Sequence, residues 1–131
     1  MNLGANPPDK LMDTAKAVEE GLEAVMVTLK SGVSGHDVHA AWDAVLKRYG
    51  LSKESRIGYS MGIGLPPDWG EHTVSLRSGE HSPIKANTCI HIMLGMWMDG
   101  WGMEMSETIQ VTDTGVECLT NFPRGIKIVG D

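Results

Sequence analysis

The chain has 131 residues and a mass of 14.2 kDa, which is the length of one domain with a single hydrophobic core. Its 11 basic and 17 acidic residues give a net charge of −6, which disfavours binding to the phosphates of nucleic acids. Hydrophobic residues make up 41% of the chain, which excludes a disordered protein. Since no apolar run approaches the ~18 residues of a membrane span, a membrane protein is also disfavoured.

Two amphipathic helices are predicted in the first part of the chain. Asn6-Pro7-Pro8-Asp9 is a typical helix start, and apolar residues then recur every three or four positions until Lys30-Ser31-Gly32. A second helix begins after Ser34, whose spacing to Asp37 predicts a capping box, and it ends at Gly50. We expect the helices to occupy residues from about 8 to 50.

The remainder, from about residue 56 to 131, is predicted to form antiparallel strands and loops. Residues 58–70 are rich in glycine and proline and are expected to hold one short buried strand at most. Clearer strands are expected at 88–94, 101–111 and 116–119, with a further candidate at 126–129. Asp99-Gly100 predicts a hairpin turn between the first two. Two helices followed by antiparallel strands indicate a single α+β domain.

The two cysteines give a prediction about the cellular compartment. Cys89 and Cys118 lack the CxxC spacing, and Met1-Asn2-Leu3-Gly4 has no signal-peptide pattern. We therefore expect reduced thiols in a cytoplasmic protein.

Aromatic residues and methionines are concentrated in two segments. Five methionines lie between Met93 and Met105, together with Trp97 and Trp101. Composition alone favours a methionine-rich core over an apolar cleft with aromatic walls. A second segment, Pro66-Pro67-Asp68-Trp69-Gly70-Glu71, places another indole between two carboxylates. Because aromatic faces can hold a delocalised cation, two such segments in one domain support a small-molecule pocket.

Charge and strand alternation refine this expectation. Residues 59–110 contain 2 basic and 6 acidic residues, which fits either a pocket for a cationic ligand or a solvated acidic face. Alternation places Glu104, Ser106 and Thr108 on one face of their strand and Glu107 on the other. His91 is a plausible partner for Glu104 across the hairpin, although a hydrogen-bonded core histidine is the simpler interpretation.

Four strings carry a resemblance to a known family. Residues 58–64, 66–71, 91–95 and 97–108 resemble the catalytic domain shared by creatinase, aminopeptidase P and prolidase, and within it the ectoine hydrolase branch. The resemblance extends from about residue 7 to 129. It implies the pita-bread fold, of which this chain would be the second half: two helices packed on a curved antiparallel sheet. The family's two metal-binding aspartates, and the catalytic histidine of creatinase, belong to the other half.

The same resemblance has a consequence for metal binding. Tyr59 stands where the peptidases carry a ligand histidine, and Met93 and Ser106 stand where they carry ligand glutamates. Because these side chains are poor ligands for two divalent ions, no metal cofactor is expected. Glu107 cannot compensate, since one step along a strand reverses the face.

The resemblance also assigns candidate site residues. Glu104 occupies the position of a cleft-facing arginine, which implies a substrate anchor or proton-transfer group that suits an amidinium ion. Tyr59 and His91 are expected to act with it by hydrogen bonding in catalysis. The substrate-binding candidates are Asp68, Trp69, Glu71, Trp97, Trp101 and Ser106.

Three functions remain open at this stage. The first is half of a metal-independent C–N hydrolase that opens a small cyclic amidine such as ectoine. The second is a fragment of an Xaa-Pro dipeptidase or aminopeptidase, which metal binding would support. The third is a non-enzymatic small-ligand-binding domain that forms a homodimer, because an uncovered apolar sheet should not remain in water.

Overall fold

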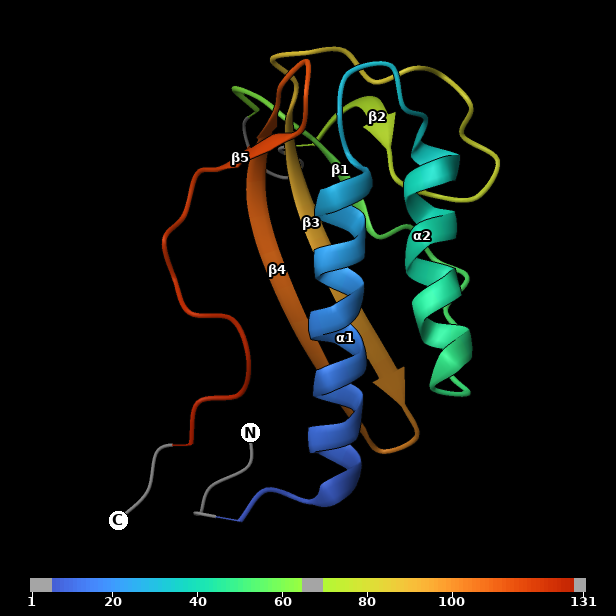
Figure 1. Ribbon diagram of the computed structural model, residues 1–131, viewed down its shortest axis with the longest axis vertical. Helices are drawn as coiled ribbons and strands as arrows, with labels where there is room; N and C mark the ends of the chain where they lie inside the picture. Colours follow the sequence, from blue (N-terminus) through green and yellow to red (C-terminus); the bar gives the residue numbers. More distant parts are fainter. Residues whose placement is uncertain (1–5, 65–69, 129–131) are drawn as a thin grey trace.

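The structure, a computed structural model, describes residues 6–64 and 70–128 and consists of two helices and a five-stranded sheet (Figure 1). The helices are α1 (Asp9–Thr28) and α2 (Gly35–Arg48). The strands are β1 (Gly58–Met61), β2 (Gly70–Ser75), β3 (Cys89–Met98), β4 (Trp101–Val111) and β5 (Val116–Cys118). All neighbouring strands run antiparallel, in the order β2-β1-β3-β4-β5. The predicted α+β class is confirmed.

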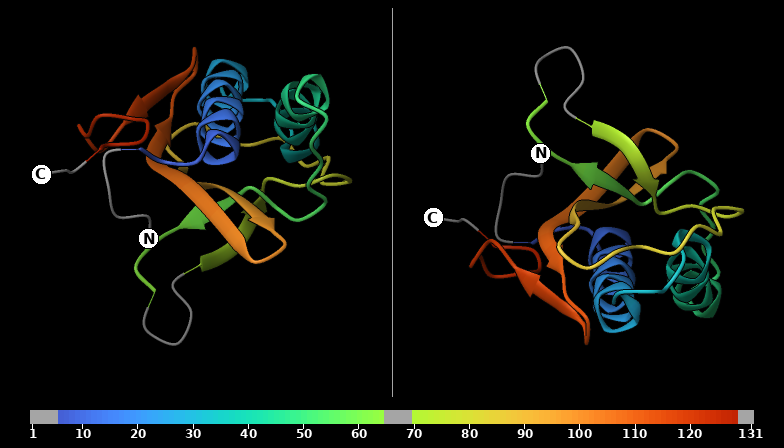
Figure 2. Two further views of the ribbon diagram at one scale, coloured as in Figure 1. Left: turned by 90° about the horizontal axis from the view of Figure 1, so that it is seen from below. Right: turned by 90° about the horizontal axis from the view of Figure 1, so that it is seen from above.

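Both helices lie on the same side of a strongly curled sheet (Figure 2). Helix α1 packs on β3 and β4, and α2 packs beside α1. In the part of the chain that the structure describes, the opposite side of the sheet carries no helix, and we call it the open face. The predicted arrangement, two helices packed on a curved antiparallel sheet, is therefore confirmed. Among the described residues, neither helix combines the length and the apolar character that crossing a membrane requires.

The helices begin where the sequence predicted. Helix α1 starts at Asp9 after the proline pair and runs for 20 residues. At the start of α2, the Ser34 hydroxyl accepts a hydrogen bond from the Asp37 N–H at 3.2 Å, and Asp37 accepts one from the Ser34 N–H. This is the predicted capping box. Hydrogen bonds from the side chain and backbone of Ser34 also hold the pKa of Asp37 below its usual value.

A glycine and a tryptophan allow the two helices to approach closely. Trp42 of α2 is fully buried, and a Cβ atom placed on Gly21 of α1 would lie only 2.0 Å from its ring. Around this contact the core continues to the sheet through the large apolar side chains of β3 and β4. Its fully buried members include Leu22, Leu46, Ile90, Ile92, Leu94 and Ile109.

The β3–β4 hairpin is the longest regular feature of the sheet. Asp99-Gly100 forms its turn, with Gly100 at φ +73°, a backbone conformation that suits glycine. Met98 pairs with Trp101, and pairing then continues without interruption to Cys89 and Gln110. The predicted turn is confirmed, and β3 extends four residues beyond its predicted end at Leu94.

One strand was missed by the sequence prediction, and one predicted strand is not formed. β1 is the short strand expected within residues 58–70, whereas β2, which begins at Gly70 and ends at Ser75, was not predicted. The expected strand at 126–129 is not formed in its described part, 126–128. After Cys118, the Leu119 N–H still donates to the Thr108 carbonyl of β4 at 2.9 Å, and the side chains of Thr120 and Arg124 then bind Glu107 of β4. Val129 lies outside the described residues.

Candidate functional site

The two faces of the sheet differ in chemistry. The residues of β3 and β4 that point toward the helices are mostly apolar and buried. Those on the open face are partly or fully exposed and include polar side chains: Cys89, His91, Met93, Trp97, Glu104, Ser106 and Thr108. Glu104 is exposed, whereas the side chain of Glu107 is only 4% exposed. The prediction that these two carboxylates point in opposite directions is therefore confirmed.

One row of polar side chains crosses the open face at its β1 end. Tyr59 of β1 pairs with His91 of β3, which pairs with Thr108 of β4. The Tyr59 and His91 rings are 5.6 Å apart between centroids, and His91 Nδ1 lies 3.4 Å from Thr108 Oγ1. The guanidinium of Arg56 lies 4.8 Å from the centre of the Tyr59 ring. Two of the three predicted catalytic residues, Tyr59 and His91, are thus in contact.

The third predicted catalytic residue, Glu104, lies elsewhere on this face. Its partner on β3 is Gly95 and not His91, so the expected His91–Glu104 pair is wrong. Four residues along β3 separate His91 from Gly95, which corresponds to about 13 Å. The two groups cannot hydrogen-bond directly at this distance.

Glu104 and Trp97 gather over a glycine on the open face. A Cβ atom on Gly95 would lie 2.8 Å from the Trp97 ring and 3.2 Å from Glu104 Oε2, so both side chains use the space that the glycine leaves. Trp97 remains 69% exposed. Between this pair and the Tyr59 row, Met93 lies directly opposite Ser106. Among the described residues, Glu104 has no hydrogen-bond or ion-pair partner.

Lys53 adds a positive charge that the sequence interpretation missed. It lies in the loop between α2 and β1, and its side chain is half-buried. Burial lowers the pKa of its ammonium group, and the negative charge of Glu104 partly offsets this shift. The charges of Lys53 and Glu104 therefore act on each other through space, without an ion-pair contact. No spacing in the sequence relates two residues so far apart in the chain.

The remaining predicted substrate-binding residues are dispersed. Trp101 lies on the helix side of the sheet, where Lys10 of α1 is 5.1 Å from its ring centre, so it does not face Trp97. Glu71 places its carboxylate against Gly62, beyond the end of β1. Asp68 and Trp69 lie outside the described residues.

The three open-face positions that the resemblance aligns with metal ligands carry neither a carboxylate nor an imidazole. Among residues 6–64 and 70–128, no three His, Cys, Asp or Glu side chains are arranged to hold one. The three positions that the resemblance aligns with metal ligands supply a phenol, a thioether and a hydroxyl, from Tyr59, Met93 and Ser106. All three lie on the open face. Thioether and neutral hydroxyl groups are weak ligands for hard divalent ions.

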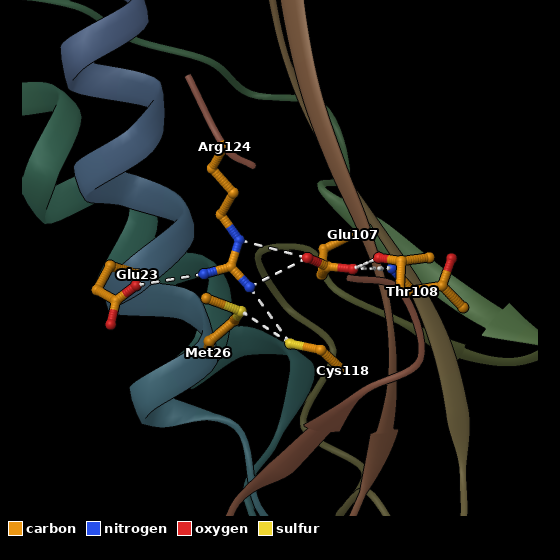
Figure 3. Close-up of polar contacts among 7 residues, drawn as sticks. Glu23, Met26, Glu107, Thr108, Cys118 and Arg124 are labelled. Carbon is orange, nitrogen blue, oxygen red and sulfur yellow. Dashed lines mark hydrogen bonds and ion pairs between the residues drawn. The ribbon is translucent and has the colours of Figure 1, made fainter. Parts of the chain in front are cut away.

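A second hollow lies on the helix side of the sheet. It has a volume of about 750 Å³ and is bounded by α1, the end of β5 and the segment that follows β5. Arg124 is its centre (Figure 3): Nη2 donates to Glu107 Oε2 at 3.0 Å and to Cys118 Sγ at 3.3 Å, and Nη1 lies 3.8 Å from Glu23. Sequence reasoning missed Arg124, since no periodic pattern links it to Glu107.

Glu107 is held in its charged form. Burial alone would raise its pKa, but hydrogen bonds from Thr120, Arg124 and the Thr108 N–H outweigh burial and hold the pKa below its usual value. The charges of Glu107 and Arg124 at the centre of this hollow therefore pair with each other. This pairing indicates that the hollow joins the last segment to the body of the domain. The open face, with its unpaired Glu104, is the stronger candidate site.

Known proteins resemble the chain in both sequence and fold. A model of metallopeptidase family M24 matches residues 2–113. Ectoine hydrolase of Halomonas elongata is 37% identical over 119 residues, which cover 90% of this chain and 30% of that protein. An uncharacterized hydrolase/peptidase of Sinorhizobium fredii is 39% identical over 124 residues, 94% of this chain and 31% of that protein.

The solved structures give the same fold. Dipeptidase PepE from Mycobacterium ulcerans superposes with a TM-score of 0.88 at 23% identity, over 99% of this chain and 34% of that one. The chain thus spans about 30% of the length of the curated relatives that it matches. The family model covers most of the chain, and the curated relatives match nearly its whole length. The chain belongs to metallopeptidase family M24.

Proposed function

We propose that the open face forms part of the active site of a metal-independent hydrolase that breaks a C–N bond in a small cyclic amidine of the ectoine type. The observation that carries this proposal is Glu104, an exposed carboxylate with no partner among the described residues, beside the exposed ring of Trp97. A carboxylate forms paired hydrogen bonds with a planar amidinium, and an indole face attracts a delocalised cation.

The donor chemistry of the face supports the metal-independent form of this reaction. The phenol of Tyr59, the thioether of Met93 and the hydroxyl of Ser106 do not suit two divalent ions. An amidinium already carries the positive charge that polarises its central carbon. Water can therefore add to that carbon if a general base takes its proton, and the ring opens when a general acid protonates the departing nitrogen.

His91 is the described residue best suited to move such a proton. Its ring is half-buried and has a hydroxyl within 3.4 Å, that of Thr108, which fixes its orientation. Because His91 and Glu104 lie about 13 Å apart, one small amidine cannot contact both. We therefore assign the binding of the amidinium to Glu104. We infer that a second surface, facing the open face, supplies the remaining catalytic residues.

That second surface would come from a longer polypeptide or from a second copy of this chain. The curated relatives are about three times as long as this chain, which favours the first arrangement for the active enzyme. If no longer polypeptide supplies this second surface, a homodimer would cover the half-exposed methionines and Trp97 of the open face. Sedimentation of the folded chain separates these cases, because a monomer at all concentrations contradicts the homodimer.

Calorimetric titration with ectoine, with manganese titrated in parallel, tests the proposal. We expect saturable ectoine binding that Glu104→Gln weakens by about tenfold, since the lost contact is a charged hydrogen bond. Glu117→Gln, on exposed β5, is the matched control and should bind as the unmodified chain does.

The other outcomes have defined meanings. Manganese binding without ectoine binding would favour an Xaa-Pro metallopeptidase of the prolidase type. Absence of both would place ligand recognition outside these 131 residues and overturn the role given to Glu104.

A further inference from the structure

A small pocket beside helix α2 shares no lining residue with the hollow around Arg124. Its volume is about 270 Å³, which is room for a molecule of several heavy atoms. Helix α2, the loop that follows it and the turn after β2 supply its walls. We call it the Lys53 pocket, and its lining residues are His36, His39, Ala40, Asp43, Lys53, Glu54 and Ser78.

Lys53 differs from every other lysine of the chain in its surroundings. All seven lysines lie in the part of the chain that the structure describes, and Lys53 alone is half-buried while the other six are exposed. Its ammonium group has no ion-pair partner within the described ranges, whereas Lys47 of α2 pairs with Asp43 at 2.6 Å. The charged form of an enclosed, unpaired amino group is less stable than that of an amino group in water.

The electrostatic surroundings of Lys53 act in the same direction. Burial lowers the pKa of its ammonium group, and the charge of Glu104 opposes this shift only in part. A larger share of Lys53 is therefore the free amine at neutral pH than is usual for a lysine. Free amines are nucleophiles, and lysines in partly dry pockets are the ones that attack carbonyl carbons in proteins.

Two imidazoles on the walls of the pocket can handle the proton that such a reaction moves. His36 Nδ1 accepts a hydrogen bond from the Gly79 N–H at 3.1 Å, so the neutral ring carries its proton on Nε2. His39 is 6% exposed, and its Nε2 has no hydrogen-bond partner among residues 6–64 and 70–128. The pocket therefore has one imidazole that can donate a proton and another with an unsatisfied ring nitrogen.

We propose that the Lys53 pocket captures small, uncharged aldehydes as an imine on Lys53. The amine nitrogen attacks the carbonyl carbon and forms an N–C bond, and the adduct then loses its hydroxyl group as water. A proton that His36 gives to the departing hydroxyl is replaced by the proton that the nitrogen loses. Aldehyde and amine thus give imine and water, and nothing is oxidised or reduced.

The charges of the pocket select against an anionic aldehyde. Asp43 and Glu54 both line it, and in the described part of the chain only Asp43 has an ion-pair partner. When Lys53 is the free amine, these two carboxylates leave the pocket with a negative balance, which repels anions. The capture of an aldehyde here does not depend on the amidine proposal for the open face.

The test is reductive trapping of the imine with propionaldehyde and sodium cyanoborohydride at pH 7, followed by peptide mapping with mass spectrometry. We expect Lys53 to be labelled at least about threefold faster than Lys85 and Lys127, because more of it is free amine. At pH 10.5, the ordinary lysine value, this advantage should disappear, since the exposed lysines are then also deprotonated in large part. Glyoxylate, an aldehyde that carries a carboxylate, should show a smaller preference for Lys53.

Two variants and the contrary outcomes make the result decisive. Glu104→Gln removes the charge that favours the ammonium form, so it should speed the labelling of Lys53 by about twofold and leave that of Lys85 unchanged. Glu117→Gln, on exposed β5, is the matched control and should change neither rate. Labelling of Lys53 at pH 7 that is no faster than that of the exposed lysines would show that burial only shields the amine, and would overturn the proposal.

A preference for Lys53 as strong with glyoxylate as with propionaldehyde would overturn the assignment to uncharged aldehydes. The labelling of the unmodified chain decides both points even if a variant fails to fold.

Discussion

The two sides of the sheet have different roles in this domain. The helix side holds the core that stabilises it, and the open side carries the candidate binding residues. On the helix side, Ile90, Ile92 and Leu94 are fully buried against the helices, and the buried carboxylate of Glu107 is hydrogen-bonded on both oxygens. On the open side, Glu104 and Trp97 are exposed. Because residues on alternate sides of a strand share one backbone, stability and binding can be altered independently by substitutions one residue apart.

The largest expected contrast is between two tryptophans. Trp42→Ala should lower the free energy of unfolding by about 3–5 kcal/mol, because it empties the fully buried contact between the helices. Trp97→Ala should lower it by less than about 1 kcal/mol, since that ring is exposed, while weakening ectoine binding. Urea unfolding followed by circular dichroism measures both. Equal losses of stability would contradict the division between the faces.

A second contrast compares the two glutamates of β4. Glu107→Gln should cost about 1–3 kcal/mol, because it weakens the charged hydrogen bonds with Arg124. Glu104→Gln should change the free energy of unfolding by about 0.5 kcal/mol or less, as is usual for exposed positions. Thermal unfolding of the matched pair at neutral pH gives the comparison. A larger loss for Glu104→Gln would assign it a structural role.

The same glutamate predicts a dependence on pH. The folded-state pKa of Glu107 lies below its usual value, so its stabilisation is complete above the normal carboxyl range and disappears as the pH falls through the folded pKa. The unmodified chain should therefore lose more stability on acidification below about pH 4.5 than Glu107→Gln does. Urea midpoints at a series of acidic pH values test this. Parallel curves for the two proteins would show that the pair with Arg124 is not formed in solution.

A glycine substitution tests how the side chains of Trp97 and Glu104 rest on the open face. Gly95→Ala should displace Trp97 and Glu104, because its Cβ would lie within 3.2 Å of both, but both side chains can move into solvent. We expect a stability change within about 1 kcal/mol, altered tryptophan fluorescence and weaker ectoine binding. Gly115→Ala, where nothing lies within 4 Å of the added atom, is the control. Unchanged fluorescence would show that the two side chains do not rest on Gly95.

Much of this arrangement follows from local sequence signals. The proline pair, the Ser34–Asp37 capping box and the Asp99-Gly100 turn each predicted an element boundary, because each acts on residues close in the chain. The turn also determines the register of the two strands that it joins. With Met98 opposite Trp101, counting back along both strands places His91 opposite Thr108 and Glu104 opposite Gly95.

Other features depend on contacts that no local pattern records. Strand β2 lacks an alternating burial pattern, so its sequence resembles a loop. The segment after β5 is positioned by the ion pair between Arg124 and Glu107. These two residues are 17 positions apart in the sequence, and no repeating pattern links them. Likewise, the path of the whole chain brings Lys53 within reach of the charge of Glu104. The sequence predicts which faces exist, but only the fold shows which side chains meet on them.

The uninterrupted pairing of β3 with β4 has a consequence for how the gene can vary. A single codon inserted or deleted between Glu104 and Glu107 would turn one carboxylate to the side of the other. If Glu104 turns, its charge is buried without a partner; if Glu107 turns, it becomes exposed and loses its hydrogen bonds with Arg124. Length variation within this hairpin should therefore be tolerated in steps of two residues, or at the turn itself, where Gly100 has open space around it.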